Sequence, residues 1–469
     1  MIGLLNHTAD AWGRPVRWLV LTGIVIALLN AALVLGLILH GDHPIEAAKS
    51  TGPVHSRALL DNISNDSWYA MAKAQDHFDT DPKRDLYGVF FDQGVKFQYP
   101  PSALLVLDLF PSSLYSGYDS LHRGSSLNVL LSVLTRIALL LTVLFSAAIL
   151  YRAIQSDARE WGETTSQRPL LGTALFWVLC LALGVTFYPL VRGHSLGQIQ
   201  VFLGCLAAGA LLAFQSQHRG LAGACLGLCC LIKPQFAVVL LWGLLRREWR
   251  FAGWFVAVGL AGAVMSLLEF GWDNHLRYLD VLQLISKHGE AFGANQSING
   301  LFHRLLGNGE AVIWSERSFA PFHPVVYYTT LVTSVMILVC ALKPPRDRST
   351  KATALDMSIA LLGATMASPV AWEHHYGVLL PIFAVAAPSI LRALPGRAAP
   401  VLLISSYVLS TSALLRPEFV FATQLSSLLG AHLFFGAAIL FVLLLMTRSR
   451  LTAAGMGHTD RAMRTILNP

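Results

Sequence analysis

Long apolar segments recur along this chain, and short polar segments separate them. The first apolar run covers residues 16–40, which is long enough to cross a bilayer as a helix at about 1.5 Å per residue. Runs of the same character predict further crossings at residues 127–153, 170–191, 199–214, 251–270, 325–342, 355–366, 376–391, 401–415 and 431–446. The pattern predicts an all-α polytopic membrane protein.

Two apolar stretches are ambiguous, and the distribution of basic residues decides between their alternatives. Residues 102–115 are short and contain Pro111, and residues 221–245 are broken by Lys233 and Pro234. If the first stretch is re-entrant or interfacial and the second forms two short helices, the basic clusters between crossings all fall on one side of the membrane. This arrangement predicts about twelve transmembrane helices with both chain ends in the cytoplasm.

The polar segments divide the chain without creating a second domain. No small-residue cleavage site follows the first apolar run, so we expect that run to remain as a transmembrane helix. The chain is expected to be a single membrane domain over residues 1–469. Its polar parts are an outer loop with amphipathic juxtamembrane helices at 41–126, a second long outer loop at 271–323 and a cytoplasmic tail at 447–469.

Composition supports the membrane assignment and excludes several classes of site. Hydrophobic residues make up 54% of the chain and charged residues 13%, whereas soluble domains carry roughly 25% charged residues. The net charge of +7 is interpreted as a topology signal, with no nucleic-acid partner. The six cysteines lie in apolar runs without metal-ligand spacing, so neither a disulfide nor a zinc site is expected. No phosphate-cradling G-x-x-x-x-G-K-[ST] motif occurs, so a sugar donor would have to arrive on a lipid.

The polar stretch from residue 65 to residue 101 follows the first apolar run and carries the strongest candidate for a general base. Asp66 begins a partly amphipathic segment at 66–78 that could lie on the membrane surface. A partly desolvated carboxylate there is suited to accept a proton from a substrate hydroxyl. Alternatively, Asp66 caps that helix, and Asp61 is a second candidate for the base.

Lys233 and the segment around Arg192 could bind an anionic group. Lys233 lies deep in an apolar run, where an unpaired ammonium group is costly, so it should meet an anion such as a lipid phosphate. It could equally extend to the membrane interface. Arg192, His194 and Gln198 bridge two helices and offer donors to phosphate or sugar oxygens, although they would also suit a plain outer loop.

A second group of polar residues follows later in the chain. Trp372, His374 and His375 stand at a helix end, where a histidine could bind a phosphate and the tryptophan a sugar ring. An interfacial aromatic belt with solvated histidines is the alternative. Asn295 and Arg304 lie in the second outer loop, where they could contact an acceptor.

The order of these motifs resembles glycosyltransferase family 87, the polyprenyl-phosphate-mannose-dependent alpha-mannosyltransferases. The resembling residues are Asp66 with Tyr69 and Ala70; Phe97 with Tyr99, Pro100 and Pro101; Gly197 with Gln198; Ile232, Lys233 and Pro234; Asn295, Gln296 and Ser297 with Arg304; and Ser368, Pro369, Trp372, His374 and His375.

The resemblance implies a GT-C-type glycosyltransferase fold with a catalytic first outer loop. It implies Asp66 as the catalytic base of an inverting transfer from a polyprenyl-phosphate sugar, most simply mannose. Donor-binding candidates are Lys233, His374, His375, Arg192, His194 and Gln198. Candidates for contact with the acceptor or the sugar are Tyr69, Tyr99, Trp372, Asn295 and Arg304. Fixed cations would serve the singly charged phosphate, so neither a metal nor a cofactor is expected.

The expected setting is a bacterial inner or plasma membrane, with the active site on the non-cytoplasmic face and membrane lipids around the helices. The acceptor could be a glycolipid, a polysaccharide or a protein. A sibling enzyme that transfers arabinose or glucose is a further alternative. A polytopic transporter or lipid flippase is the rival from another class, although paired repeats with broken helices are typical of transporters and no internal repeat is evident here.

Overall fold

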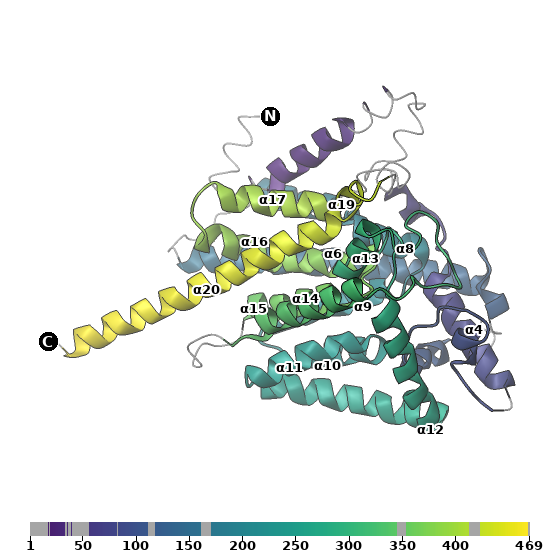
Figure 1. Ribbon diagram of the computed structural model, residues 1–469. Coiled ribbons are helices and arrows are strands. Elements are labelled where there is room, and N and C mark those ends of the chain that lie inside the picture. Colours follow the sequence, from purple (N-terminus) through teal and green to yellow (C-terminus); the bar gives the residue numbers. More distant parts are fainter. Residues whose placement is uncertain are drawn as a thin grey trace.

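The computed structural model describes residues 17, 19–32, 35, 39, 56–81, 83–110, 118–160, 170–344, 353–411 and 423–467. These residues form helices and connecting segments, with one isolated antiparallel bridge between Asn295 and Trp372 and no named strand. The predicted all-α class is therefore confirmed for the described part of the chain. Figure 1 shows most of the helices side by side in one bundle.

The helices follow one another along the whole described chain. In the first half they are Leu19–Ala32, η1 (Ser56–Leu60), α4 (Asp66–Thr80), α5 (Gly88–Phe91), η2 (Pro101–Leu109), η3 (Tyr118–Leu121), α6 (Ser126–Glu160), α7 (Leu170–Val185), α8 (Tyr188–Leu196), α9 (Gln200–Gln215) and α10 (Arg219–Ile232). In the second half they are η5 (Pro234–Phe236), α11 (Ala237–Leu245), α12 (Trp249–His288), α13 (Ile298–Leu305), α14 (Pro324–Leu342), α15 (Ala354–Met366), η6 (Glu373–Val378), α16 (Leu379–Ala393), α17 (Ala398–Thr411), α19 (Ser427–Gly430) and α20 (His432–Leu467).

Several of these helices are long and apolar enough to cross a bilayer. Among the described residues five pass that test alone, or up to six when the bent pair α7 and α8 is counted as one span. Shorter apolar helices such as α9, α10 and α15 lie among them. Long apolar helices of this kind make the protein an integral membrane protein, while the predicted number of twelve spans stays a prediction.

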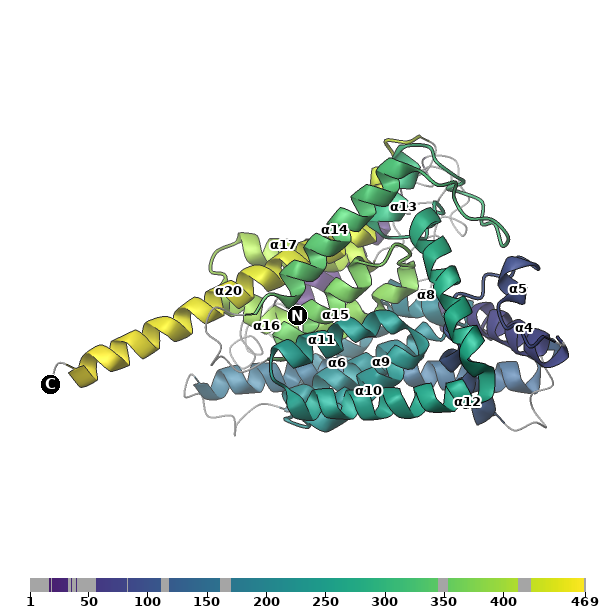
Figure 2. The ribbon, with the colours of Figure 1, turned by 60° about the horizontal axis from the view of Figure 1, so that its bottom comes forward.

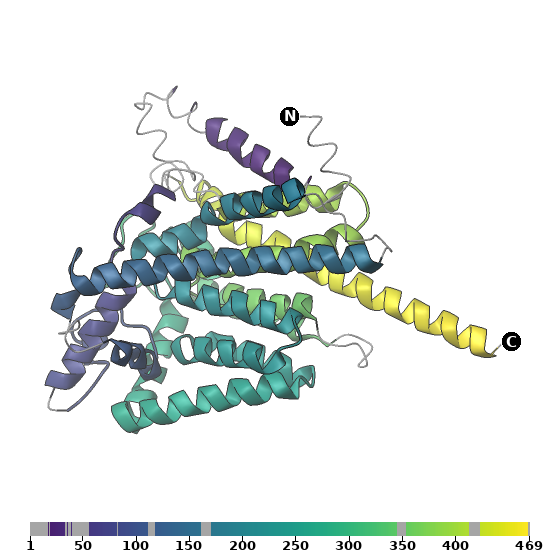
Figure 3. The ribbon, with the colours of Figure 1, turned by 180° about the vertical axis from the view of Figure 1, so that it is seen from behind.

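The first outer loop folds into a helical layer at one end of the bundle. Figure 2 shows α4 and α5 beside α8 at that end. The layer has its own hydrophobic cluster, in which Trp68 and Phe97 are buried and which also takes in Ile199, at the start of α9, and Phe270 of α12. Burial of these side chains fixes the layer onto the transmembrane helices. Figure 3 shows α6, in blue, running from that end along the length of the bundle.

Breaks in the helices occur at residues that disfavour a continuous helix. α7 and α8 meet at 51°, where Pro189 in the first turn of α8 lacks an amide donor. α10 ends at Ile232 and a new helix begins at Pro234, as predicted for the stretch 221–245. η2 is too short to cross a bilayer.

Two helices extend further than the polar pattern predicts. α12 continues to His288 across a kink at Gly271, which has a φ of 73°. The expected second outer loop at 271–323 therefore contains helix over its first part and again in α13. α20 runs on to Leu467, and Figure 1 shows its last turns extending beyond the bundle.

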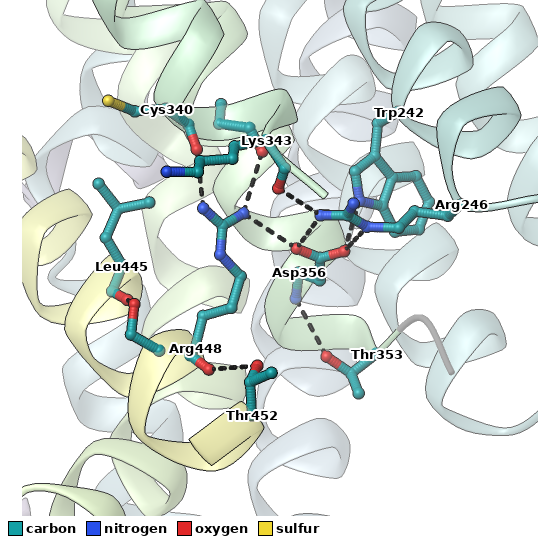
Figure 4. Close-up of polar contacts among 11 residues, drawn as sticks. Trp242, Arg246, Cys340, Lys343, Thr353, Asp356, Leu445, Arg448 and Thr452 are labelled. Atoms are coloured by element: carbon teal, nitrogen blue, oxygen red, sulfur yellow. Dashed lines mark hydrogen bonds and ion pairs between the residues drawn. The ribbon is translucent and has the colours of Figure 1, made fainter. Parts of the chain in front are cut away.

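An ionic cluster ties α11, α14, α15 and α20 together at the end of the bundle opposite α4 (Figure 1), and Figure 4 shows its contacts. Asp356, at the start of α15, accepts hydrogen bonds from Arg246, from Trp242 Nε1 at 2.9 Å and from Arg448 Nη1 at 3.2 Å. Arg448 Nη2 also donates to the Cys340 carbonyl at the end of α14, at 2.8 Å. The Asp356 and Arg246 side chains are 8% and 3% exposed, so water contributes little to either charge.

Replacing Asp356 with Ala is expected to lower the free energy of unfolding by about 3–5 kcal/mol, because two arginines would lose their buried counter-ion. Thermal unfolding of the detergent-solubilised protein measures the change. Asp280→Ala is the matched control, because Asp280 pairs with Arg277 at 3.2 Å on an exposed helix face, where an ion pair contributes little. Equal effects of the two substitutions would show that the cluster does not hold the helices together.

Candidate active site

The turn between α8 and α9 brings the first outer loop into backbone contact with the bundle. Gly197, the C-cap of α8, has a φ of +68°, a conformation that favours glycine. A Cβ placed on Gly197 would overlap the Ser64 carbonyl oxygen. The Ser64 amide in turn donates to the Ser195 carbonyl at 3.0 Å. The turn therefore fixes the chain two residues before Asp66.

Asp66 is the first residue of α4 and faces Gln198. The Gln198 Nε2 donates to Asp66 Oδ2 at 2.5 Å. Burial raises the pKa of the Asp66 carboxyl group, although the residue keeps part of its surface exposed to solvent. The Gln198 hydrogen bond and the charge of Arg192 lower that pKa, and Glu316 raises it. The N-cap of α4 is Asn65, so Asp66 does not have the capping role that we considered.

Arg192 interacts with several of the groups near the Asp66 carboxylate. Its Nε lies 3.6 Å from Glu373 Oε2, and the Tyr188 hydroxyl donates to the same oxygen at 2.9 Å. The charge of Arg192 also acts on Asp66 and on His374. A Cβ placed on the neighbouring Gly193 would lie 3.4 Å from the His374 Cβ, so α8 and η6 pack closely. The charge of Arg192 therefore acts both on the Asp66 carboxylate and on the pair of histidines, His374 and His375.

Lys233 and the two histidines form the second half of the site. The Lys233 Nζ lies 2.5 Å from the His375 Nε2, and the rings of His374 and His375 have their centroids 4.8 Å apart. The Lys233 side chain is thus directed toward η6 and not toward the membrane interface, which was the alternative. Within the described residues, His374 Nε2 and His375 Nδ1 are buried without a hydrogen-bond partner. Buried polar atoms normally have partners, so these nitrogens are suited to hold an anionic ligand.

Asn295 and its neighbours hold the segment that leads into η6. The Asn295 side-chain amide donates to the Pro369 carbonyl at 3.1 Å and accepts from the Ala371 amide at 2.9 Å. Arg304 Nη1 donates to the Asn295 carbonyl at 3.0 Å. Asn295 and Arg304 expose 0% and 3% of their surfaces, so they face the protein's own backbone. Both side chains thus hold this segment in place, and their expected contact with an acceptor stays a prediction.

The aromatic candidates lie in different surroundings. Trp372 packs edge-on against Trp314, with ring centroids 5.2 Å apart, and Trp314 packs against Phe292. Tyr69 is exposed at 44% of its surface on α4. The Tyr99 hydroxyl lies 2.9 Å from the Ser67 Oγ, next to Asp66 in the chain. Tyr99 thus lies beside Asp66 and its neighbour Ser67, and Trp372 belongs to a separate aromatic cluster with Trp314 and Phe292.

His194 does not join the other donor candidates. It is fully buried, and it lies near Arg136 and near the backbone of Ala58 and Asp61. This places it on the side of α8 that faces η1. The carbonyl of Asp61, the alternative base, accepts a hydrogen bond from Arg136 Nη2 at 2.6 Å. Asp61 is therefore not among the residues described around Arg192.

Sequence reasoning missed Ser67, Tyr188 and Glu373. Ser67 is a plain serine beside the candidate base, and Glu373 stands within the resembling motif at a position that we left unassigned. The signal that could have found Glu373 is the need of Arg192 for a counter-ion in an apolar setting. Within the described ranges, no group of three or more His, Cys, Asp or Glu side chains could hold a metal ion.

Comparison with known proteins gives matches to one family. The chain matches glycosyltransferase family 87 over residues 97–369, more than half of its length. That part includes Gln198 and Lys233, whereas Asp66 precedes it. No solved structure matches the chain.

Two of the similar proteins come from mycobacteria. The Mycobacterium tuberculosis (strain CDC 1551 / Oshkosh) polyprenol-phosphate-mannose-dependent alpha-(1-2)-phosphatidylinositol pentamannoside mannosyltransferase is 29% identical over 309 residues, covering 63% of this chain and 61% of that protein. The Mycolicibacterium smegmatis (strain ATCC 700084 / mc(2)155) polyprenol-phosphate-mannose-dependent alpha-(1-2)-phosphatidylinositol mannoside mannosyltransferase is 28% identical over 322 residues, covering 65% of this chain and 66% of that protein. The chain thus spans less than two thirds of the length of each relative.

These matches confirm the resemblance predicted from the order of the motifs. The family match covers most of the bundle, from Phe97 to Pro369. The two relatives are named for a sugar-transfer activity. This protein belongs to glycosyltransferase family 87.

Proposed function

We propose that this protein is an inverting, polyprenyl-phosphate-mannose-dependent mannosyltransferase with a GT-C-type fold. Its acceptor is a glycolipid, as the names of the mycobacterial relatives suggest for those proteins. Two buried ring nitrogens without a hydrogen-bond partner, His374 Nε2 and His375 Nδ1, carry this proposal, together with Lys233 beside His375. Nitrogens of this kind are suited to hold a phosphate, and the charge of Arg192, which pairs with Glu373, also acts on the carboxylate of Asp66.

Asp66 is the general base of the proposed reaction. Its carboxylate takes the proton of an acceptor hydroxyl, and the hydroxyl oxygen forms a bond to the anomeric carbon of the donor sugar. At the same time, the bond between that carbon and the phosphate oxygen breaks, and the phosphate leaves on the opposite face of the sugar. The proton remains on Asp66 until it is released to solvent.

The leaving group is the polyprenyl phosphate, whose negative charge grows as the bond breaks. Lys233 and Arg192 supply fixed positive charge, and the two histidines supply ring nitrogens. Because these donors are held in place before the reaction, they need little rearrangement in the transition state. In this proposal Glu373 and Tyr188 keep Arg192 in position.

The proposed setting is the non-cytoplasmic face of a bacterial inner membrane. The basic cluster of Arg246, Lys343 and Arg448 lies at the end of the bundle opposite α4, and basic residues are enriched on the cytoplasmic side. This orientation would place Asp66 on the far face, where a lipid-borne donor can reach it.

The decisive experiment is transfer in vitro by the purified protein. Synthetic polyprenyl-phosphate sugars and an extracted lipid fraction are supplied, and the product is identified by mass. A mannosylated lipid supports the proposal. Sugar counterflow in vesicles without any transfer product would instead favour transport.

Replacing Lys233 with Ala is expected to weaken donor binding about 10- to 100-fold, because a charge-assisted contact to the phosphate is lost. Binding of a synthetic polyprenyl phosphate to the solubilised protein measures the effect. Lys287→Ala is the control, since Lys287 lies exposed near the end of α12. Unchanged donor binding in Lys233→Ala would remove Lys233 from the phosphate site.

The rate of transfer is expected to fall on acidification. Only the ionised Asp66 can accept a proton, and burial raises the pKa of this group. The loss of activity should therefore begin at a higher pH than an ordinary aspartate would give. A profile of kcat/KM against pH for the free enzyme tests this, and a flat profile across the acidic range would contradict the assignment.

A further inference from the structure

Ser67 is the centre of a hydrogen-bond chain that ends on Asp66. Its Oγ donates to the Gln198 Oε1 at 2.6 Å and accepts from the amide of Ile199 at 3.2 Å. The Tyr99 hydroxyl lies 2.9 Å from the same oxygen. The other end of the Gln198 side chain donates to Asp66 Oδ2 at 2.5 Å. Ser67 is 2% exposed and Gln198 6% exposed, so solvent does not satisfy these groups in place of the protein.

The direction of each hydrogen bond follows from the number of protons available. The Ile199 amide can only donate, and the Ser67 hydroxyl has a single proton to give. If that proton goes to Gln198, Tyr99 must donate to Ser67. Burial raises the pKa of the Tyr99 phenol, so that hydroxyl keeps its proton. One orientation of every group in the chain then satisfies all of the contacts.

The same reasoning fixes the Gln198 amide, whose oxygen and nitrogen have similar shapes. In the reverse orientation, the amide oxygen would face the ionised Asp66, and two acceptors would be in contact. In the observed orientation the Ser67 proton is donated to the Gln198 Oε1, so the hydroxyl and the ionised Asp66 together favour one orientation of the amide. The nitrogen is then directed at Asp66.

We propose that Ser67 is a positioning residue that orients the Gln198 amide and thereby keeps Asp66 in its proton-accepting form. This inference rests on the proposed function, in which Asp66 is the base. It moves Gln198 from the donor-binding set to the support of the base. Tyr99 acts with Ser67, and its own carbonyl is held by the Tyr87 hydroxyl at 2.8 Å.

Other charged groups act on Asp66 and must be kept constant in any test. Arg192 on α8 and Glu316 in the second outer loop are the charges that act on Asp66 directly. The elements packed against α4 also carry acids, with Asp92 beside α5 and Asp108 in η2. None of these residues is changed in the variants below.

The test is the dependence of kcat/KM on pH for Ser67→Ala, Ser67→Thr and Gln198→Leu. In Ser67→Ala the amide loses its orienting donor, so kcat/KM should fall about tenfold on the acid side of the profile. On the alkaline plateau the loss should be small, and donor binding should be unchanged. Ser67→Thr keeps the hydroxyl and should keep the wild-type shape of the profile.

A double variant separates orientation of the amide from a general loss of structure. Because Ser67 acts through Gln198, the Ser67→Ala/Gln198→Leu variant should show no further shift beyond Gln198→Leu alone. Thr80→Ala is the control, since its hydroxyl lies on the exposed far turn of the same helix, and its profile should match that of the wild type.

Additive losses in the double variant, or a loss in Ser67→Ala that is equal at every pH, would overturn the positioning role. The proposed function would survive that result if Asp66→Asn were inactive. If Asp66→Asn kept full activity, the assignment of the base itself would fail, whatever the result for Ser67.

Discussion

Asp66→Asn is expected to lower the rate of sugar transfer by about 10²–10⁴-fold, the usual contribution of a general base. The amide has nearly the same shape as the carboxylate, but it cannot accept the proton of the acceptor hydroxyl. Donor binding should stay close to normal, because the phosphate is assigned to Lys233, Arg192 and the histidines. Turnover with a synthetic donor and binding of the donor alone give the two measurements.

Asp79→Asn is the matched control, because Asp79 is an exposed acid on the same helix that pairs with Gln75. It should keep wild-type turnover. Full activity in Asp66→Asn would move the base to another carboxylate, with Asp61 the first to test. A parallel loss of donor binding would instead show that the substitution disturbs the phosphate site.

Gly197→Ala is expected to abolish most of the activity, although Gly197 bears no functional group. The residue has a φ of +68°, and an added Cβ would overlap the Ser64 carbonyl oxygen. Either the turn or the first outer loop must then move, and Asp66 lies two residues from the point of contact. A displacement of about 1 Å in a reacting group can cost about 10²-fold in rate, so transfer should fall by at least about that factor.

Gly253→Ala provides the control for this substitution. Gly253 lies within α12, and a Cβ added there has no atom within 4 Å. It should leave activity unchanged and slightly favour the helix. Wild-type transfer by Gly197→Ala would show that the close approach of the outer loop to α8 is not needed for the reaction.

Local features of the sequence predicted the helical framework well. Runs of apolar residues predicted α6, α9 and α14 because a helix within a bilayer is apolar over its length, whether it faces lipid or other helices. Pro234 predicted the break after α10, since proline cannot continue the helix before it. The extent of α12 was not predicted, because the residues after Gly271 alternate between polar and apolar, and helical geometry resumes beyond the kink.

The candidate site was predicted as a set of residues but not as an arrangement. The sequence singled out Asp66, Arg192, Lys233 and the two histidines; Arg192 lies within the short helix α8, and the others stand at helix ends or breaks. Their roles relative to one another were not available from spacing. Asn295, for example, looked like a loop residue free to touch an acceptor, and it is fully buried against the backbone near Pro369.

By itself, the sequence determined that this protein is a helical membrane protein of one glycosyltransferase family, because hydrophobic length and short motifs are local properties of the chain. The tertiary structure alone decided that Gln198 meets Asp66 across 132 residues and that Arg192 meets Glu373. Contacts of this kind depend on how whole helices pack, since the position of each helix is set by side chains along its entire length. The order of residues around either partner therefore carries no sign of the other.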